Sequence, residues 1–204
     1  MKRLIVAGLL CLPMSFAAVA EDKHRQLSAH EHGHGSFNIA IEGKRVNMEL
    51  EAPGADIVGF EHKARTKKQK AAVSAAKKKL KELTNVVGLP EAAGCKLKKA
   101  SIELHIEGDD HDDDKHGKKK KAKHSHEHGK KEAKKEAKEE SHSEFHAEYQ
   151  LSCASPEKLV EIQFPYFKNF KSAEELEVSV AGPKSQKKFE VERDTGKINL
   201  GGII

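Results

Sequence analysis

Hydrophobic and polar residues alternate over two neighbouring stretches near the N-terminus. Residues 36–42 read SFNIAIE and residues 45–51 read RVNMELE, with Gly43-Lys44 between them and Pro53-Gly54 after them. Side chains of an extended strand point alternately to its two faces, so each stretch predicts a strand with one apolar face. The short Gly-containing connection predicts that the two strands form a hairpin.

A second pair of alternating segments flanks a stretch that has no apolar pattern. Residues 102–107 read IELHIE and residues 144–151 read EFHAEYQL, which predicts a second hairpin. If its apolar faces align, His105 and His146 share the polar face, either opposite or diagonal to one another. Between the strands, residues 108–143 contain no Leu, Ile, Val, Met or aromatic residue. Such a stretch cannot bury enough apolar surface to fold, so we predict a disordered insert.

One segment has helical rather than alternating spacing. Thr66 and Gln69 form a capping-box pattern, and an apolar stripe follows, which predicts a helix over 67–85. Further strands are expected at 158–163, 175–181 and 188–193, with Gly182-Pro183 as the turn between the last two. The predicted fold class is therefore α+β: a mainly antiparallel sheet with one principal helix and a disordered His/Lys/Asp-rich hairpin insert.

The first twenty residues have the layout of a secretory signal peptide. Lys2 and Arg3 precede an apolar run from Leu4 to Leu12, and Ala18-Val19-Ala20 provides a small-residue cleavage site. The run is too short for a membrane span, and no later segment resembles one. A lipoprotein anchored through Cys11 is the alternative. We therefore expect a periplasmic protein whose residues 21–204 form a single domain, with no transmembrane segment after cleavage.

Two cysteines, Cys95 and Cys153, remain after that cleavage. They bracket the second hairpin, and an even pair in an oxidising compartment predicts one disulfide. In the chain-entropy model this crosslink contributes roughly 4 kcal/mol.

Charge and motifs exclude several classes of function. The insert looks basic, but its eleven Lys oppose five Asp and five Glu, and it lacks the aromatic residues that single-strand binding uses. Nucleic acid is therefore not an expected partner. The chain has no nucleophile elbow, HExxH helix, P-loop or dinucleotide fingerprint, so we expect no enzyme.

The candidate chemistry is in the histidines, of which the chain has thirteen. The tetrapeptide His-Glu-His-Gly occurs at 30–33 and again at 126–129, each time within a run that places histidines at every second position. Such residues point to the same side of an extended chain, where zinc accepts imidazole nitrogen. Cu²⁺ and Ni²⁺ are the alternative ions. The predicted metal ligands are His30, His32, His34, His105, His111, His116, His124, His126, His128, His142 and His146.

The pattern resembles that of a known family. His30-Glu31-His32-Gly33, the run Val58-Gly59-Phe60-Glu61-His62 before a capped helix, Ala93-Gly94-Cys95 and the segment 149–153 are similar to the ZrgA-like periplasmic zinc-binding proteins. The resemblance implies a zinc-regulated protein that assists zinc uptake, and the lysine-rich insert is a departure from the family. It also favours His62 as a ligand, with Glu61 and Asp56 either as acidic partners, Glu61 as a metal ligand, or as groups that orient an imidazole. The alternative for His62 is a histidine that only bonds to backbone, and Glu49 and Glu51 are weaker candidates on a polar strand face.

Three functions follow from these observations. The first is capture of Zn²⁺ under zinc limitation and its delivery to a zinc importer or the importer's periplasmic binding component. The second is a general divalent-metal buffer or metallochaperone for zinc, copper or nickel. The third is a cell-envelope interaction module that binds no metal.

Overall fold

The computed structural model describes residues 32–107 and 142–204. The predicted signal peptide and residues 108–141 of the predicted insert lie outside the described residues. None of the helices within the described segments is long and apolar enough to cross a membrane.

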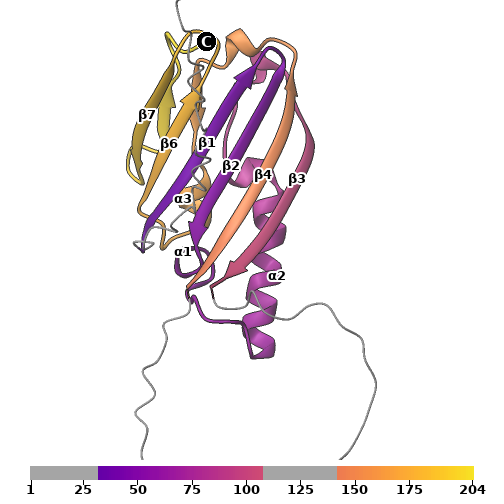
Figure 1. The fold of residues 1–204 in the computed structure, drawn as a ribbon, viewed down its shortest axis with the longest axis vertical. Helices are drawn as coiled ribbons and strands as arrows, with labels where there is room; N and C mark the ends of the chain where they lie inside the picture. The colour runs from indigo at the N-terminus through magenta and orange to yellow at the C-terminus, as the bar shows by residue number, and fades with distance from the viewer. Residues whose placement is uncertain (1–31, 108–141) are drawn as a thin grey trace, which may run out of the picture.

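The main element is a six-stranded sheet, shown in Figure 1. Its order is β3-β4-β2-β1-β6-β7, and every neighbouring pair is antiparallel except β1 with β6, which are parallel. The α+β prediction is thereby confirmed. The strands are β1 (His34–Glu42), β2 (Arg45–Pro53), β3 (Cys95–Ile106), β4 (Ser143–Cys153), β6 (Glu175–Ala181) and β7 (Gln186–Glu192).

Both predicted hairpins are present. In β1–β2, Ile39 lies opposite Met48, so the apolar residues of the two strands share one face. In β3–β4, Ile102 lies opposite Ala147 in the same way. Cys95 and Cys153 face each other at the far end of that hairpin and are joined by the predicted disulfide.

Strand β4 begins inside the segment that the sequence assigns to the insert. Ser143 is its first residue and is buried. A Cβ atom added at Gly54 would lie 2.2 Å from the Ser143 hydroxyl, so only glycine allows this close approach. The insert therefore ends before Ser143, because packing against Gly54 holds that residue in place although it is polar.

The predicted principal helix is α2 (Lys67–Lys81), and its capping box between Thr66 and Gln69 is formed. The helix ends four residues earlier than expected, at an extended Glu82, and a 3₁₀ turn, η1 (Leu83–Asn85), follows. Side chains bind the carbonyls freed there: Asn85 donates to Lys79 and the buried Tyr149 hydroxyl to Leu80. The other short helices are α1 (Gly54–Val58), η2 (Glu91–Ala93), η3 (Pro156–Lys158) and α3 (Tyr166–Asn169).

The C-terminal part differs from the expected strand pattern in two places. The segment expected to be a strand from residue 158 begins as the 3₁₀ turn η3, because Pro156 starts a turn there, and only Glu161–Gln163 forms a strand, β5. It pairs with a strand that was not predicted, β8 (Lys197–Asn199). Three residues with a single apolar member are too few to show alternation.

The sheet has one buried face and one polar face. Helices α2 and α3 lie behind the sheet in the view of Figure 1, on the same side as the apolar side chains. Tyr149 bonds to α2, and Phe37 packs edge-on against Phe164 after β5. The polar side chains of all six strands point to the opposite face, where the candidate ligands of β2 and β4 lie.

Candidate metal centre

One end of the polar face carries a histidine and two carboxylates from adjacent strands. Glu51 on β2 lies directly opposite His146 on β4, and Glu49 is two positions before Glu51 on the same face. One ligand atom from each of these three side chains lies within 4.8 Å of the other two, and all three are half-buried. We call Glu49, Glu51 and His146 the His146 cluster. In the described part of the chain no other three histidine, cysteine or carboxylate side chains approach one another so closely.

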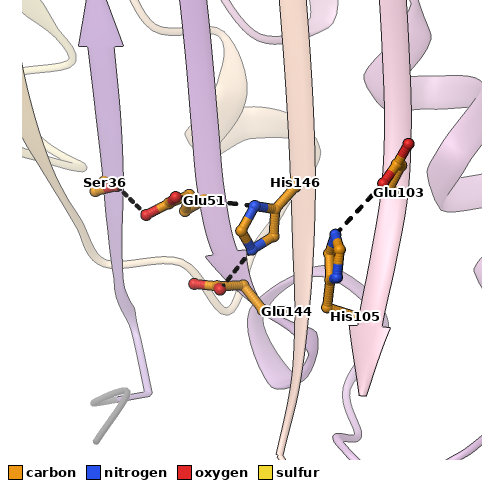
Figure 2. A network of polar contacts seen from close by, with 6 residues as sticks. All are labelled: Ser36, Glu51, Glu103, His105, Glu144 and His146. Carbon is orange, nitrogen blue, oxygen red and sulfur yellow. Dashed lines mark hydrogen bonds and ion pairs between the residues drawn. The ribbon is translucent and has the colours of Figure 1, made fainter. Parts of the chain in front are cut away.

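The imidazole of His146 is held in one orientation by the residue two positions before it. Its Nε2 atom lies 2.7 Å from a carboxylate oxygen of Glu144, which is only 6% exposed (Figure 2). A carboxylate only accepts hydrogen bonds, so Nε2 carries the proton and the lone pair of the neutral ring is on Nδ1. This hydrogen bond raises the pKa of His146 above 6.5; burial opposes the rise, and the charges of Glu144, Glu51 and Glu49 add to it.

The remaining nitrogen faces the acidic pair. Nδ1 of His146 lies 3.8 Å from Oε1 of Glu51. The other oxygen of Glu51, Oε2, accepts a hydrogen bond of 3.2 Å from the Ser36 hydroxyl on β1, as Figure 2 shows. Glu144 thus contacts Nε2 of the imidazole, and Ser36 contacts Oε2 of the Glu51 carboxylate. Nδ1 of His146 and Oε1 of Glu51 are left directed at each other.

His105 lies beside this cluster on β3. Its ring meets that of His146 edge-on, with centroids 4.4 Å apart, and its Nε2 atom is 3.5 Å from Glu103. The two histidines are diagonal to each other, since Glu103 is the residue directly opposite His146. The expectation that they share one face is confirmed.

A second group of side chains surrounds Glu61, in the loop between α1 and α2. One carboxylate oxygen, Oε1, lies 3.1 Å from Nε2 of His32, and the other, Oε2, lies 2.8 Å from Nδ1 of His142. Three predicted ligands that are far apart in the sequence therefore meet. We call His32, Glu61 and His142 the Glu61 cluster.

Asp56 on α1 lies close to the Glu61 cluster. It is 3% exposed, and its Oδ1 atom accepts the backbone N–H of Gly33 at 2.8 Å. Burial raises the pKa of Asp56 from 3.8 to about 6, opposed by the Gly33 hydrogen bond and by the charge of His32, while the charge of Glu61 adds to the rise. Within the described part of the chain, neither Oδ2 of Asp56 nor Oε1 of Glu61 has a hydrogen-bond partner.

Residues 29–200 match the model of the ZrgA family, described as zinc uptake proteins. The chain belongs to the ZrgA family. No curated protein matches it. The resemblance seen in the sequence is thereby confirmed, and a role in zinc uptake follows for this ZrgA-family chain.

The other predicted ligands of the ZrgA-family chain fall into two sets. His34 lies 3.7 Å from Glu175 across the β1–β6 pair, in neither cluster. His62 stacks on Phe60 with centroids 5.0 Å apart, and its Nδ1 atom lies 3.1 Å from the carbonyl of Lys63. This is the backbone-bonded alternative considered for His62, although its role as a ligand is untested. The set outside the described residues comprises His30, His111, His116, His124, His126 and His128.

From the sequence alone, the acidic residues of the sheet received too little weight as candidate metal ligands. Glu49 and Glu51 resemble any polar strand residues, and Glu144 was not among the candidate ligands. Their arrangement with His146 depends on the pairing of β2 with β4, which are separated in the chain by α2 and β3. The sequence indicates strand register only within each hairpin. It therefore gave no indication that Glu49 and Glu51 of one hairpin would lie beside His146 of the other.

Proposed function

We propose that this protein captures Zn²⁺ in the periplasm and assists its uptake when zinc is scarce. The observation that carries the proposal is the His146 cluster: one imidazole and two carboxylates from adjacent strands, with donor atoms within 4.8 Å of one another. Membership of the ZrgA family supplies the link to zinc uptake.

The donor types of the cluster are those that zinc accepts. Zinc binds imidazole nitrogen at about 2.0–2.1 Å and carboxylate oxygen at about 2.0–2.2 Å. Donor atoms within 4.8 Å of one another can surround one ion that draws them to such distances. Glu144 fixes the imidazole, as carboxylates commonly do behind zinc-binding histidines.

Three protein ligands leave a fourth position of a tetrahedral zinc ion open. In a capture protein this position allows a receiving protein to add its own ligand before the first ligands leave. A groove of about 770 Å³ on the polar face adjoins the cluster, lined among others by Asn38, Glu49 and Glu148. An ion at the cluster is therefore accessible from solvent, which favours exchange over permanent structural binding. The proposal assigns no catalysed reaction to the site.

The export step of the proposal rests on the N-terminal pattern and the disulfide. Cys95 and Cys153 are bonded to each other, as expected in an oxidising compartment. Cell fractionation tests this step directly. Export predicts that the protein appears in the periplasmic fraction, shortened by about twenty residues, and cytoplasmic protein of full length would contradict it.

The binding step is tested with the exported chain, stripped of metal and titrated with zinc against a chromophoric chelator. We expect His146→Ala and Glu51→Gln each to remove one tightly held zinc ion per chain. Glu157→Gln, on the exposed turn η3, is the control and should change nothing. Parallel titrations with Cu²⁺ and Ni²⁺ distinguish zinc capture from general metal buffering. If neither cluster variant loses an ion, the His146 cluster is not the capture site.

A further inference from the structure

We infer that the Glu61 cluster is a second zinc site, in which His32, Glu61 and His142 bind one ion next to the buried carboxylate of Asp56. This inference rests on the proposed zinc capture but concerns a different set of side chains. It assigns to one site three residues from three separate segments: the turn before β1, the loop after α1 and the residue before β4.

The first argument is the direction of the donors. Both imidazoles approach the same carboxylate, at 3.1 Å for His32 and 2.8 Å for His142. The two nitrogens face different oxygens of Glu61, Oε1 and Oε2, so the exposed His32 ring must rotate for one zinc ion to contact all three side chains. Two nitrogens and a carboxylate favour zinc over Ca²⁺ or Mg²⁺, which prefer oxygen ligands only.

The second argument is the state of the two buried carboxylates. Oδ2 of Asp56 is buried and makes no hydrogen bond within the described part of the chain, and the buried Oε1 of Glu61 contacts Nε2 of His32 at 3.1 Å without hydrogen-bond geometry. A buried polar atom without a hydrogen bond is costly, roughly 1–3 kcal/mol. A bound cation would satisfy the Asp56 oxygen, so this atom supports a metal ion independently of the imidazole contacts.

The third argument is that the backbone holds the ligands in place. The carbonyl of Gly33, next to His32, accepts hydrogen bonds from the N–H groups of Glu174 and Glu175, at 2.8 Å and 2.9 Å. The carbonyl of His142 accepts the N–H of Glu107 at 2.8 Å. The side chain of His32 is 65% exposed, so it is free to rotate toward an ion between the other two ligands. Less ordering entropy is then lost on binding than for ligands on an unstructured chain.

Chelator competition on the full exported chain tests the site by comparing the number of tightly held zinc ions in the wild type and in variants. Glu61→Gln should remove one tightly held zinc ion, His146→Ala should remove another, and the double variant should lack both. His32→Ala, at an exposed position outside the core, should weaken the binding of one ion about tenfold or more. Glu157→Gln, which removes a carboxylate on the exposed turn η3, is the matched control for Glu61→Gln and should keep both ions. Circular dichroism of the metal-free variants checks that each is folded.

Hydrogen exchange of the Gly33 amide, which bonds to Asp56, gives a second readout. Zinc should slow this exchange in the wild type and in His146→Ala, but not in Glu61→Gln. If Glu61→Gln and His32→Ala keep every tight ion and zinc still slows the Gly33 amide, the inference is overturned. Loss of an ion in His146→Ala alone would leave the proposed function intact without a second site. If only Glu61→Gln and His32→Ala lose a tightly held zinc ion, the capture site is the Glu61 cluster and not the His146 cluster.

Discussion

His146 on β4 and Glu51 on β2 lie directly opposite each other in the sheet, with Nδ1 of the imidazole 3.8 Å from Oε1 of the carboxylate. The two residues belong to different hairpins. Their approach is therefore a product of the sheet order, in which β4 inserts next to β2. The zinc-capture account depends on this contact and on the groups that orient its two members.

The first prediction concerns Glu144. Replacing it with Gln keeps the shape of the side chain but removes the negative charge that accepts the Nε2 proton of His146. We expect the pKa of His146 to fall toward 6.5, since this hydrogen bond is the largest cause of its raised value. Zinc affinity at the His146 cluster should fall about 10–100-fold, the usual effect of losing such a partner. NMR titration of His146 and chelator competition measure the two effects, and an unchanged affinity would show that Glu144 does not support the site.

The second prediction concerns the pH dependence of stability. Because burial raises the pKa of Asp56 from 3.8 to about 6, the folded protein binds this proton more tightly than the unfolded chain does. The contribution of Asp56 to stability is therefore greatest below about pH 4 and is lost as pH rises through about 6, a change of at most about 3 kcal/mol.

Asp56→Asn retains an oxygen for the Gly33 amide but cannot ionise. In metal-free protein it should raise the melting temperature at pH 7.5 relative to wild type and have little effect at pH 4. Thermal unfolding at both pH values measures the difference. An equal effect at the two pH values would mean that Asp56 does not titrate as described.

The third prediction concerns Tyr149, which ties β4 to the end of α2. Its buried hydroxyl donates to the carbonyl of Leu80 at 2.7 Å. Tyr149→Phe should lower the free energy of unfolding by about 1–2 kcal/mol, because one of the last helix carbonyls loses its buried partner. Denaturant unfolding measures the loss. Zinc stoichiometry should stay unchanged, since Tyr149 points to the apolar face, away from both clusters.

The fourth prediction concerns the disulfide. Free-thiol labelling of the unfolded, non-reduced exported protein should detect almost no thiol, because Cys95 and Cys153 are bonded to each other. Reduction should lower stability by roughly 4 kcal/mol or less. Two reactive thiols per exported chain would contradict the pairing.

The sequence predicted the parts of the fold that depend on neighbouring segments. Both hairpins, the capped start of α2 and the face shared by His105 and His146 follow from local periodicity. The parallel pairing of β1 with β6 and the strand β8 depend on distant contacts and could not be read locally.

The same limit applies to the ligands. The histidines that meet at Glu61 were recognised by residue type, but nothing in the sequence showed that His32 and His142 would reach the same carboxylate. Glu49 and Glu51 were undervalued, because their partner His146 comes from another hairpin.

The central claim is tested most directly by anomalous diffraction at the zinc edge from crystals of the exported protein grown with about two equivalents of zinc per chain. The account predicts a peak between Nδ1 of His146 and the carboxylates of Glu49 and Glu51, and a separate peak at the Glu61 cluster. Zinc density elsewhere, with the His146 cluster empty, would contradict the claim that this cluster captures the ion.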